Sequence, residues 1–125
     1  MPQALVLSIG LDSRVLDTRA LILRSVGYTV LTAMSVKEAV PLLQSNDFDV
    51  IVICHTLPTK DCERLVSLVR ASGSRIPIVT VSGSAFGQQS VSADATLDKE
   101  PVAFLREMGE VLRSHGQTQV LHREA

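Results

Sequence analysis

One apolar stretch near the middle of the chain decides the fold: Phe48-Asp49-Val50-Ile51-Val52-Ile53-Cys54-His55-Thr56-Leu57-Pro58. The unbroken β-branched run from Val50 to Ile53 predicts a strand covered on both faces, as in the centre of a parallel sheet. Pro58 ends strand pairing and starts a turn. Because open α/β sheets bind ligands just beyond the carboxyl ends of their strands, Cys54 and His55 stand where an active site would be.

Strands and helices alternate on either side of this stretch. Besides the strand at 48–54, we expect strands at 4–9, 28–32, 76–81 and 93–97, and helices at 12–26, 35–45, 59–71 and from 100 or 101 to about 115. Such alternation predicts a parallel sheet with helices on both faces and right-handed crossovers. The fold class is therefore α/β, a flavodoxin-like three-layer sandwich with five parallel strands in the order 2-1-3-4-5. The Gly-, Ser- and Gln-rich segment 82–90 shows no helical stripe, so the fourth helix of such a fold is expected to be shortened or absent.

Four local signals mark helix starts and one marks a disturbance. Asp12-Ser13 can cap the first helix, and Ser35-Val36-Lys37-Glu38 is a capping box for the second. Thr59 begins the third helix directly after Pro58, and Pro101 suits the first position of the last helix. Pro41 lies inside the second helix, where it removes a hydrogen bond, so we expect a kink or a shifted helix there.

The apolar stripes of the helices predict which faces reach the core. In the first helix the stripe is Val15, Arg19, Ile22 and Val26, with Leu16 and Leu23 beside it; in the second it is Val36, Ala39, Val40 and Leu43. In the third it is Cys62, Leu65, Val66 and Val69, and in the last Val102, Leu105, Met108 and Leu112, flanked by Phe104 and Val111.

Length and composition predict a single domain over 1–116, followed by a polar C-terminal tail at 117–125. The net charge of −1, from 12 basic and 13 acidic residues among 125, gives no electrostatic footprint for nucleic acid or an anionic membrane. No apolar run is long enough to span a bilayer, and Met1-Pro2-Gln3 does not resemble a signal peptide, so we expect a cytoplasmic location. The two cysteines have no metal-ligand spacing, and no cofactor or metal is expected.

In detail the chain resembles the receiver domain of bacterial response regulators, the CheY-like domains of two-component (phosphorelay) signalling. The resemblance covers roughly residues 4–115. It rests on four stretches in the right order: Gly27-Tyr28-Thr29-Val30, Ala33 with Ser35-Val36-Lys37-Glu38-Ala39, residues 48–58, and Ile76-Pro77-Ile78-Val79-Thr80-Val81-Ser82. The resemblance implies the flavodoxin-like fold and a chemistry in which a histidine kinase passes a phosphoryl group to an aspartate of the receiver.

Carried over residue by residue, the resemblance meets substitutions at the reacting positions. The phosphoacceptor aspartate lies four residues before the proline that ends the third strand, and here that position is Cys54. The Mg²⁺-binding acidic pair falls on Gly10 and Leu11, with Asp12 next to them. The family's switch hydroxyl falls on Ser82 and its lysine on Lys99, although Glu100 separates Lys99 from Pro101 where the family has Lys-Pro.

These departures favour a stand-alone pseudo-receiver, not an enzyme, that acts through protein contacts without aspartyl phosphorylation. Phosphoryl transfer to an aspartate needs a carboxylate nucleophile and a divalent cation, and Mg²⁺ needs hard oxygen ligands. The expected partner is a histidine kinase or another signalling protein, and a homodimer stays open.

Two alternatives remain. Cys54, helped by Lys99 or His55, could be the thiol of a redox sensor or small enzyme. Alternatively, a receiver could be phosphorylated at a displaced residue. The simpler interpretation of Cys54 is a small half-buried filler, and Cys62 is expected to be packing.

Overall fold

The computed structural model describes residues 4–54, 57–81, 95–97 and 100–124. Its elements run β1 (Leu5–Ile9), α1 (Ser13–Ser25), β2 (Thr29–Ala33), α2 (Val36–Ser45), β3 (Val50–Ile53), α3 (Thr59–Ala71), β4 (Ile78–Val81), β5 (Ala95–Leu97) and α4 (Pro101–Glu124). All strand pairings are parallel, and the strand order is β2-β1-β3-β4-β5. The predicted α/β class and the order of the first four strands are confirmed, and β5 is a three-residue strand paired with β4.

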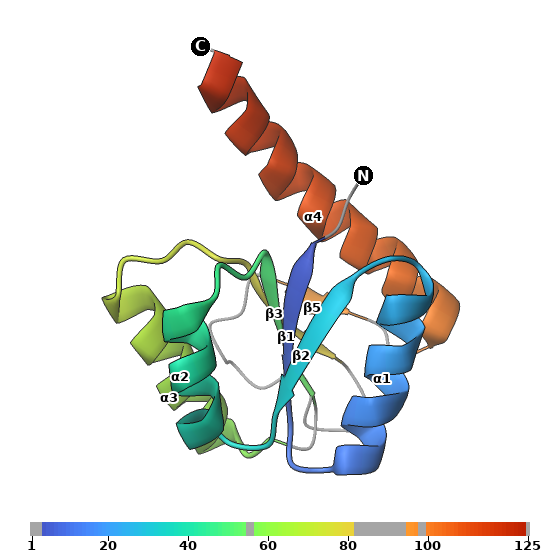
Figure 1. The fold of residues 1–125 in the computed structure, drawn as a ribbon, viewed down its shortest axis with the longest axis vertical. Helices are drawn as coiled ribbons and strands as arrows, with labels where there is room; N and C mark the ends of the chain where they lie inside the picture. Colours follow the sequence, from blue (N-terminus) through green and yellow to red (C-terminus); the bar gives the residue numbers. More distant parts are fainter. Residues whose placement is uncertain (1–3, 55–56, 82–94, 98–99, 125) are drawn as a thin grey trace.

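The helices form two layers around the sheet, with α2 and α3 on one face and α1 and α4 on the other (Figure 1). Alternation along each strand divides the core accordingly. Leu7, Ile9, Ile51 and Ile53 lie in the cluster with α2 and α3. Val6, Val50 and Val52 lie in the other cluster, with Leu23 of α1 and Phe104 and Met108 of α4. A central strand buried on both faces is what the run from Val50 to Ile53 predicted.

The helix starts follow the predicted capping chemistry. Asp12 Oδ1 accepts a hydrogen bond from the amide of Arg14 at 2.9 Å, and Ser35 Oγ accepts one from the amide of Glu38 at 3.0 Å. The Glu38 carboxylate reaches back one residue further than in the standard capping box and accepts from the amide of Met34 at 2.8 Å. These bonds satisfy backbone donors that have no partner within a helix. The second helix is continuous through Pro41 as far as Ser45.

Two of the predicted apolar stripes are wrong in part. In α1 the buried residues are Leu16, Ala20 and Leu23, while Val26 is 53% exposed. Val26 fails because the helix ends at Ser25 and Val26 is already its C-cap. In α4 the buried residues are Phe104 and Met108, whereas Val102, in the first turn, is 69% exposed. The stripes of α2 and α3 are confirmed.

The C-terminal helix is longer than the sequence suggested. The segment assigned to a polar tail, 117–125, continues α4 as far as Glu124. The helix begins on the face of the sheet, and its last turns extend beyond the sheet (Figure 1). At its start, the Glu100 side chain accepts a hydrogen bond from the amide of Ala103 at 2.9 Å, and the Glu100 carbonyl accepts one from Phe104 at 2.8 Å.

Candidate functional site at the carboxyl ends of β1 and β3

The carboxyl ends of β1 and β3 lie side by side in the sheet. Ile9 pairs with Ile53, so Gly10 and Cys54 are the next residues of neighbouring strands. The amide of Cys54 donates to the carbonyl of Ile9 at 2.9 Å, and the amide of Gly10 donates to the carbonyl of Ala33 at 3.2 Å. Cys54 is thus bonded to the last residue of β1, and Gly10 to the last residue of β2, so the carboxyl ends of these three strands lie side by side.

Cys54 is a buried free cysteine, only 1% exposed. Its sulfur lies 3.9 Å from the hydroxyl of Ser8, which is also buried, and Ser8 precedes Gly10 by two residues on β1. Because side chains alternate along a strand, Cys54 faces the same side as Val52, toward α1 and α4. The residue is therefore more deeply buried than the half-buried filler that the sequence suggested.

Arg19 of α1 brings a positive charge to this sulfur. Its Nη1 donates a hydrogen bond to Cys54 Sγ at 3.4 Å, and its Cζ lies 5.4 Å from the centroid of the Phe104 ring. The second contact has the geometry of a cation–π interaction. Among the residues that the structure describes, no carboxylate pairs with Arg19. One guanidinium on α1 thus contacts both the end of β3 and a side chain of α4.

The positions expected to replace the acidic pair do not form a cation site. Gly10 has no side chain, and Leu11 is 46% exposed. The Asp12 carboxylate caps α1 through its bond to Arg14. Within the described ranges, no group of three or more His, Cys, Asp or Glu side chains is arranged to hold a metal ion.

Several predicted positions lie outside the described residues. These are Ser82 and Lys99, the expected switch pair, together with His55 and the segment 82–90 where the shortened helix was expected. The interpretations of those positions stay predictions.

Cys62 is a packing residue, as expected. It is buried on the core face of α3, and its thiol donates to the carbonyl of Leu57 at 3.6 Å. Burial, reinforced by the negative charges of Asp61 and Glu63, raises the pKa of Cys62 to about 11.

Asp49 also has a structural partner. Its Oδ2 accepts a hydrogen bond from the amide of Leu5 at 2.8 Å, at the amino ends of β1 and β3.

Arg19 is the site residue that the sequence interpretation missed. The sequence placed it in the core stripe of the first helix but assigned it no role. A charged residue at a core-facing position was the available signal, because such a residue needs a specific partner. Only the tertiary structure shows that the partners are Cys54 and Phe104.

Comparison with known proteins supports the fold. No protein-family model matches the sequence, and no curated protein sequence matches it either. Solved structures do match: the chemotaxis response regulator CheY4 of Vibrio cholerae has 24% identity and a TM-score of 0.73, covering 88% of this chain and 99% of that one. A CheY-like receiver domain protein from Methanospirillum hungatei has 22% identity and a TM-score of 0.73 over 94% of this chain and 99% of that one.

A CheY-like receiver domain from Methylobacillus flagellatus is similar to the same degree, with 20% identity and a TM-score of 0.75 over 89% of this chain and 99% of its own. Each of these structures is matched over nearly its whole length. No helix in the described part of this chain is both long enough and apolar enough to cross a membrane. The chain has the fold of the CheY-like response-regulator receiver domains.

Proposed function

We propose that this protein is a pseudo-receiver: a receiver-fold module of two-component signalling that acts by protein–protein contact without aspartyl phosphorylation. The observation that carries the proposal is the pair at the end of β3, where the buried Cys54 thiol accepts a hydrogen bond from the Arg19 guanidinium. This pair places a sulfur, with a guanidinium beside it, where a receiver's carboxylate nucleophile would stand.

The chemistry of phosphoryl transfer does not fit these residues. An aspartyl phosphate requires a carboxylate, and its formation relies on a divalent cation to offset the phosphate charge. Mg²⁺ prefers an octahedral shell of oxygen ligands that usually includes carboxylates. Gly10 and Leu11 offer no side-chain oxygen, the sulfur of Cys54 is a soft ligand, and the Arg19 charge repels a second cation. The residues present therefore do not fit a Mg²⁺ site.

Without a charge change at this edge, the fold has no phosphate to shift it between two states. Signalling must then come from surfaces recognised by a partner, which we propose is a histidine kinase or another signalling protein. A homodimer is the alternative assembly. On this proposal the protein is not an enzyme, and it needs no cofactor.

The test is a phosphorylation assay on the full chain. The protein is incubated with acetyl phosphate and Mg²⁺ and measured by intact mass, and beryllofluoride with Mg²⁺ is titrated while amide shifts are followed by NMR. We expect no added phosphate mass and no shifts at Gly10 or Cys54. A stable phosphate adduct at any residue would overturn the proposal, and peptide mapping would then assign a receiver with a displaced phosphoacceptor.

A second candidate function follows from the same contact. A guanidinium beside a cysteine sulfur is a setting in which reactive thiols occur, so Cys54 could serve a redox sensor. Its burial argues against this, because an attacking reagent has no direct access to the sulfur. The rate of alkylation by iodoacetamide at pH 7 decides between a pseudo-receiver and a redox sensor. A Cys54 rate no faster than that of a cysteine peptide rules the sensor out, and the Cys54→Ser variant identifies which thiol reacted.

A further inference from the structure

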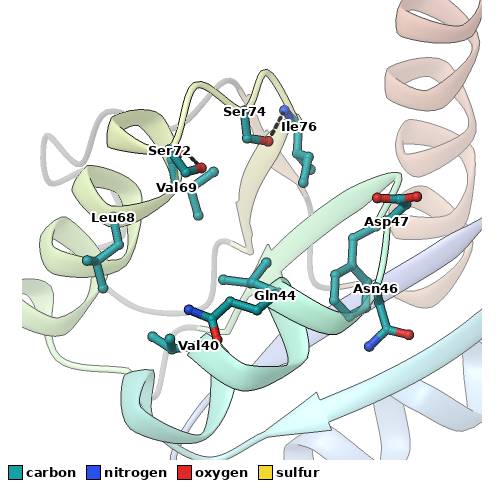
Figure 2. Close-up of a pocket in the computed structure, with 11 residues that line it drawn as sticks. Val40, Gln44, Asn46, Asp47, Leu68, Val69, Ser72, Ser74 and Ile76 are labelled. Atoms are coloured by element: carbon teal, nitrogen blue, oxygen red, sulfur yellow. Dashed lines mark hydrogen bonds between the residues drawn. The ribbon is translucent and has the colours of Figure 1, made fainter.

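A pocket of about 450 Å³ lies between α2 and α3, at the edge of the sheet opposite to Cys54. It is lined by the C-terminal halves of the two helices, by the loop before β3 and by the segment before β4 (Figure 2). Phe48 of its lining precedes β3, whereas Cys54 follows that strand. The volume falls within the range typical of sites for small organic molecules. This inference does not depend on the chemistry proposed for Cys54.

Six of the eleven residues that line the pocket are apolar. Phe48 and Val69 are buried in the core and present a fixed surface. Val40 and Ile76 are half-buried, and Leu68 is 44% exposed although it is a large aliphatic residue. Burying an apolar group against such a surface is favourable because it removes apolar area from water. A ligand for this pocket therefore has an apolar body.

Most polar groups of the lining are already engaged with the backbone. Ser72 Oγ donates to the carbonyl of Val69 at 2.7 Å, and Asn46 Nδ2 donates to the carbonyl of Leu42 at 3.0 Å. Ser74 Oγ accepts from the amide of Ile76 at 3.2 Å (Figure 2). The nearby Arg70 does not line the pocket, and its Nη1 donates to the carbonyl of Ile76 at 2.8 Å.

Two lining side chains remain available. In the part of the chain that the structure describes, neither Gln44 nor Asp47 has a hydrogen bond or ion pair through its side chain. Asp47 is also the charged residue of this lining. Figure 2 shows the Gln44 side chain reaching from α2 into the space toward α3. A carboxylate and an amide oxygen are acceptors, so the matching ligand group carries several N–H donors and a positive charge.

We propose that this pocket binds a small organic amine, with its apolar body against Phe48, Val69 and Leu68 and its ammonium group on the Asp47 carboxylate. An anionic ligand of the same shape is disfavoured because its charge meets that of Asp47. A neutral alcohol fills the same space without an ion pair. The ammonium group is therefore the feature that the pocket selects.

The experiment uses three probes that share one apolar body: phenethylamine, 2-phenylethanol and phenylacetate. Each is titrated into the full-length ¹⁵N-labelled chain, and amide shifts are followed by NMR. We expect phenethylamine to shift the amides of Phe48, Val69 and Ile76 with the lowest dissociation constant, followed by the alcohol and then the carboxylate. The Asp47→Asn variant should weaken phenethylamine binding about fivefold, the upper range for an exposed ion pair, and leave 2-phenylethanol unchanged.

Asp17→Asn is the matched control, because Asp17 is an exposed carboxylate on α1, on the other face of the sheet. It should leave all three affinities unchanged. Equal affinity for the three probes, or amine shifts confined to residues outside the pocket, would overturn the proposal. If the pocket amides shift with protein concentration alone, a second copy of the chain occupies the surface and the proposal is wrong.

Discussion

Arg19 is the residue on which the arrangement at the end of β3 depends. Its guanidinium contacts a sulfur and an aromatic ring, and both are weak partners for a cation compared with a carboxylate. The side chain therefore places a positive charge beside the buried sulfur at the end of β3. Among the described residues at this end of β3, the Arg19 guanidinium is the charge in contact with the Cys54 sulfur.

This charge makes a double-mutant cycle informative. A Cys54→Asp substitution introduces a buried carboxylate next to Arg19, and in an Arg19→Met background the same carboxylate has no cation in contact. We expect a favourable coupling of about 2 kcal/mol or more, in the free energy of unfolding, between the introduced carboxylate and Arg19. The coupling should stay below the full cost of breaking a buried ion pair, because Arg19 is half-buried. Urea denaturation of the four proteins measures it. Additive effects would contradict the contact.

The raised pKa of Cys62 predicts that the folded protein loses stability in alkaline solution. Its pKa is raised to about 11 in the folded chain, so folding favours the protonated thiol. That stability is fully present below pH 9, where the unfolded chain also holds its proton. It is lost as pH rises from 9 through about 11, because the unfolded chain ionises first. We expect the free energy of unfolding to fall over this interval.

The Cys62→Ala variant is the control for that pH profile. Burial also raises the pKa of Tyr28, which contributes a fall of the same sign in both proteins. The difference between the two profiles therefore isolates Cys62. Parallel profiles from pH 8 to pH 11 would show that the thiol is not shielded from water.

Among the elements, α2 is the one whose start depends most clearly on side chains. Ser35 and Glu38 both bond the backbone at its N-terminus. The helix has only ten residues, and Pro41 inside it donates no backbone hydrogen bond, so few internal hydrogen bonds stabilise it. Its C-terminal half also forms one wall of the pocket opposite to Cys54.

We expect Ser35→Ala to lower the free energy of unfolding by about 1 kcal/mol, the usual cost of losing an N-cap. Ser45→Ala makes the same change at the exposed last residue of the same helix, where no capping bond is lost, and should have an effect within about 0.5 kcal/mol. Thermal or urea unfolding of both variants gives the comparison. Equal losses would mean that the cap contributes nothing.

At the scale of the whole molecule, α4 has two parts with different roles. Its first turns supply Phe104 and Met108 to the core. Its last turns extend beyond the sheet (Figure 1). Among the side chains that the structure describes, the partly buried Leu105, Val111 and Leu112 also pack against this cluster.

Deleting residues 114–125 should consequently change the free energy of unfolding by no more than about 0.5 kcal/mol. Met108→Ala, in the packed part of the same helix, should lower it by about 2–5 kcal/mol because it leaves a cavity in the core. Urea denaturation of the two variants provides the measurement. A large loss on truncation would show that the last turns of α4 pack against the rest of the molecule.

The sequence by itself determined the α/β class, the order of the first four strands and the place of Cys54 directly after β3. The run from Val50 to Ile53 specified a doubly covered strand, and the position of Cys54 relative to Pro58 located the carboxyl edge of that strand. Asp12 and Ser35 fixed two helix starts, because capping involves residues only a few positions apart. The buried faces of helices were predicted less well at Val26 and Val102. Both residues continue the helical spacing of the apolar stripe, but they lie at helix ends and do not reach the core.

Only the tertiary structure decided what surrounds the Cys54 sulfur and what lies between α2 and α3. The contact between Arg19 and Cys54 joins residues 35 positions apart, and no local pattern encodes which side chain of α1 meets the end of β3. The pocket beside Asp47 likewise depends on the spacing of two packed helices. Hydrophobic periodicity selects a face of each element, whereas partners and cavities are set by how those faces come together in three dimensions.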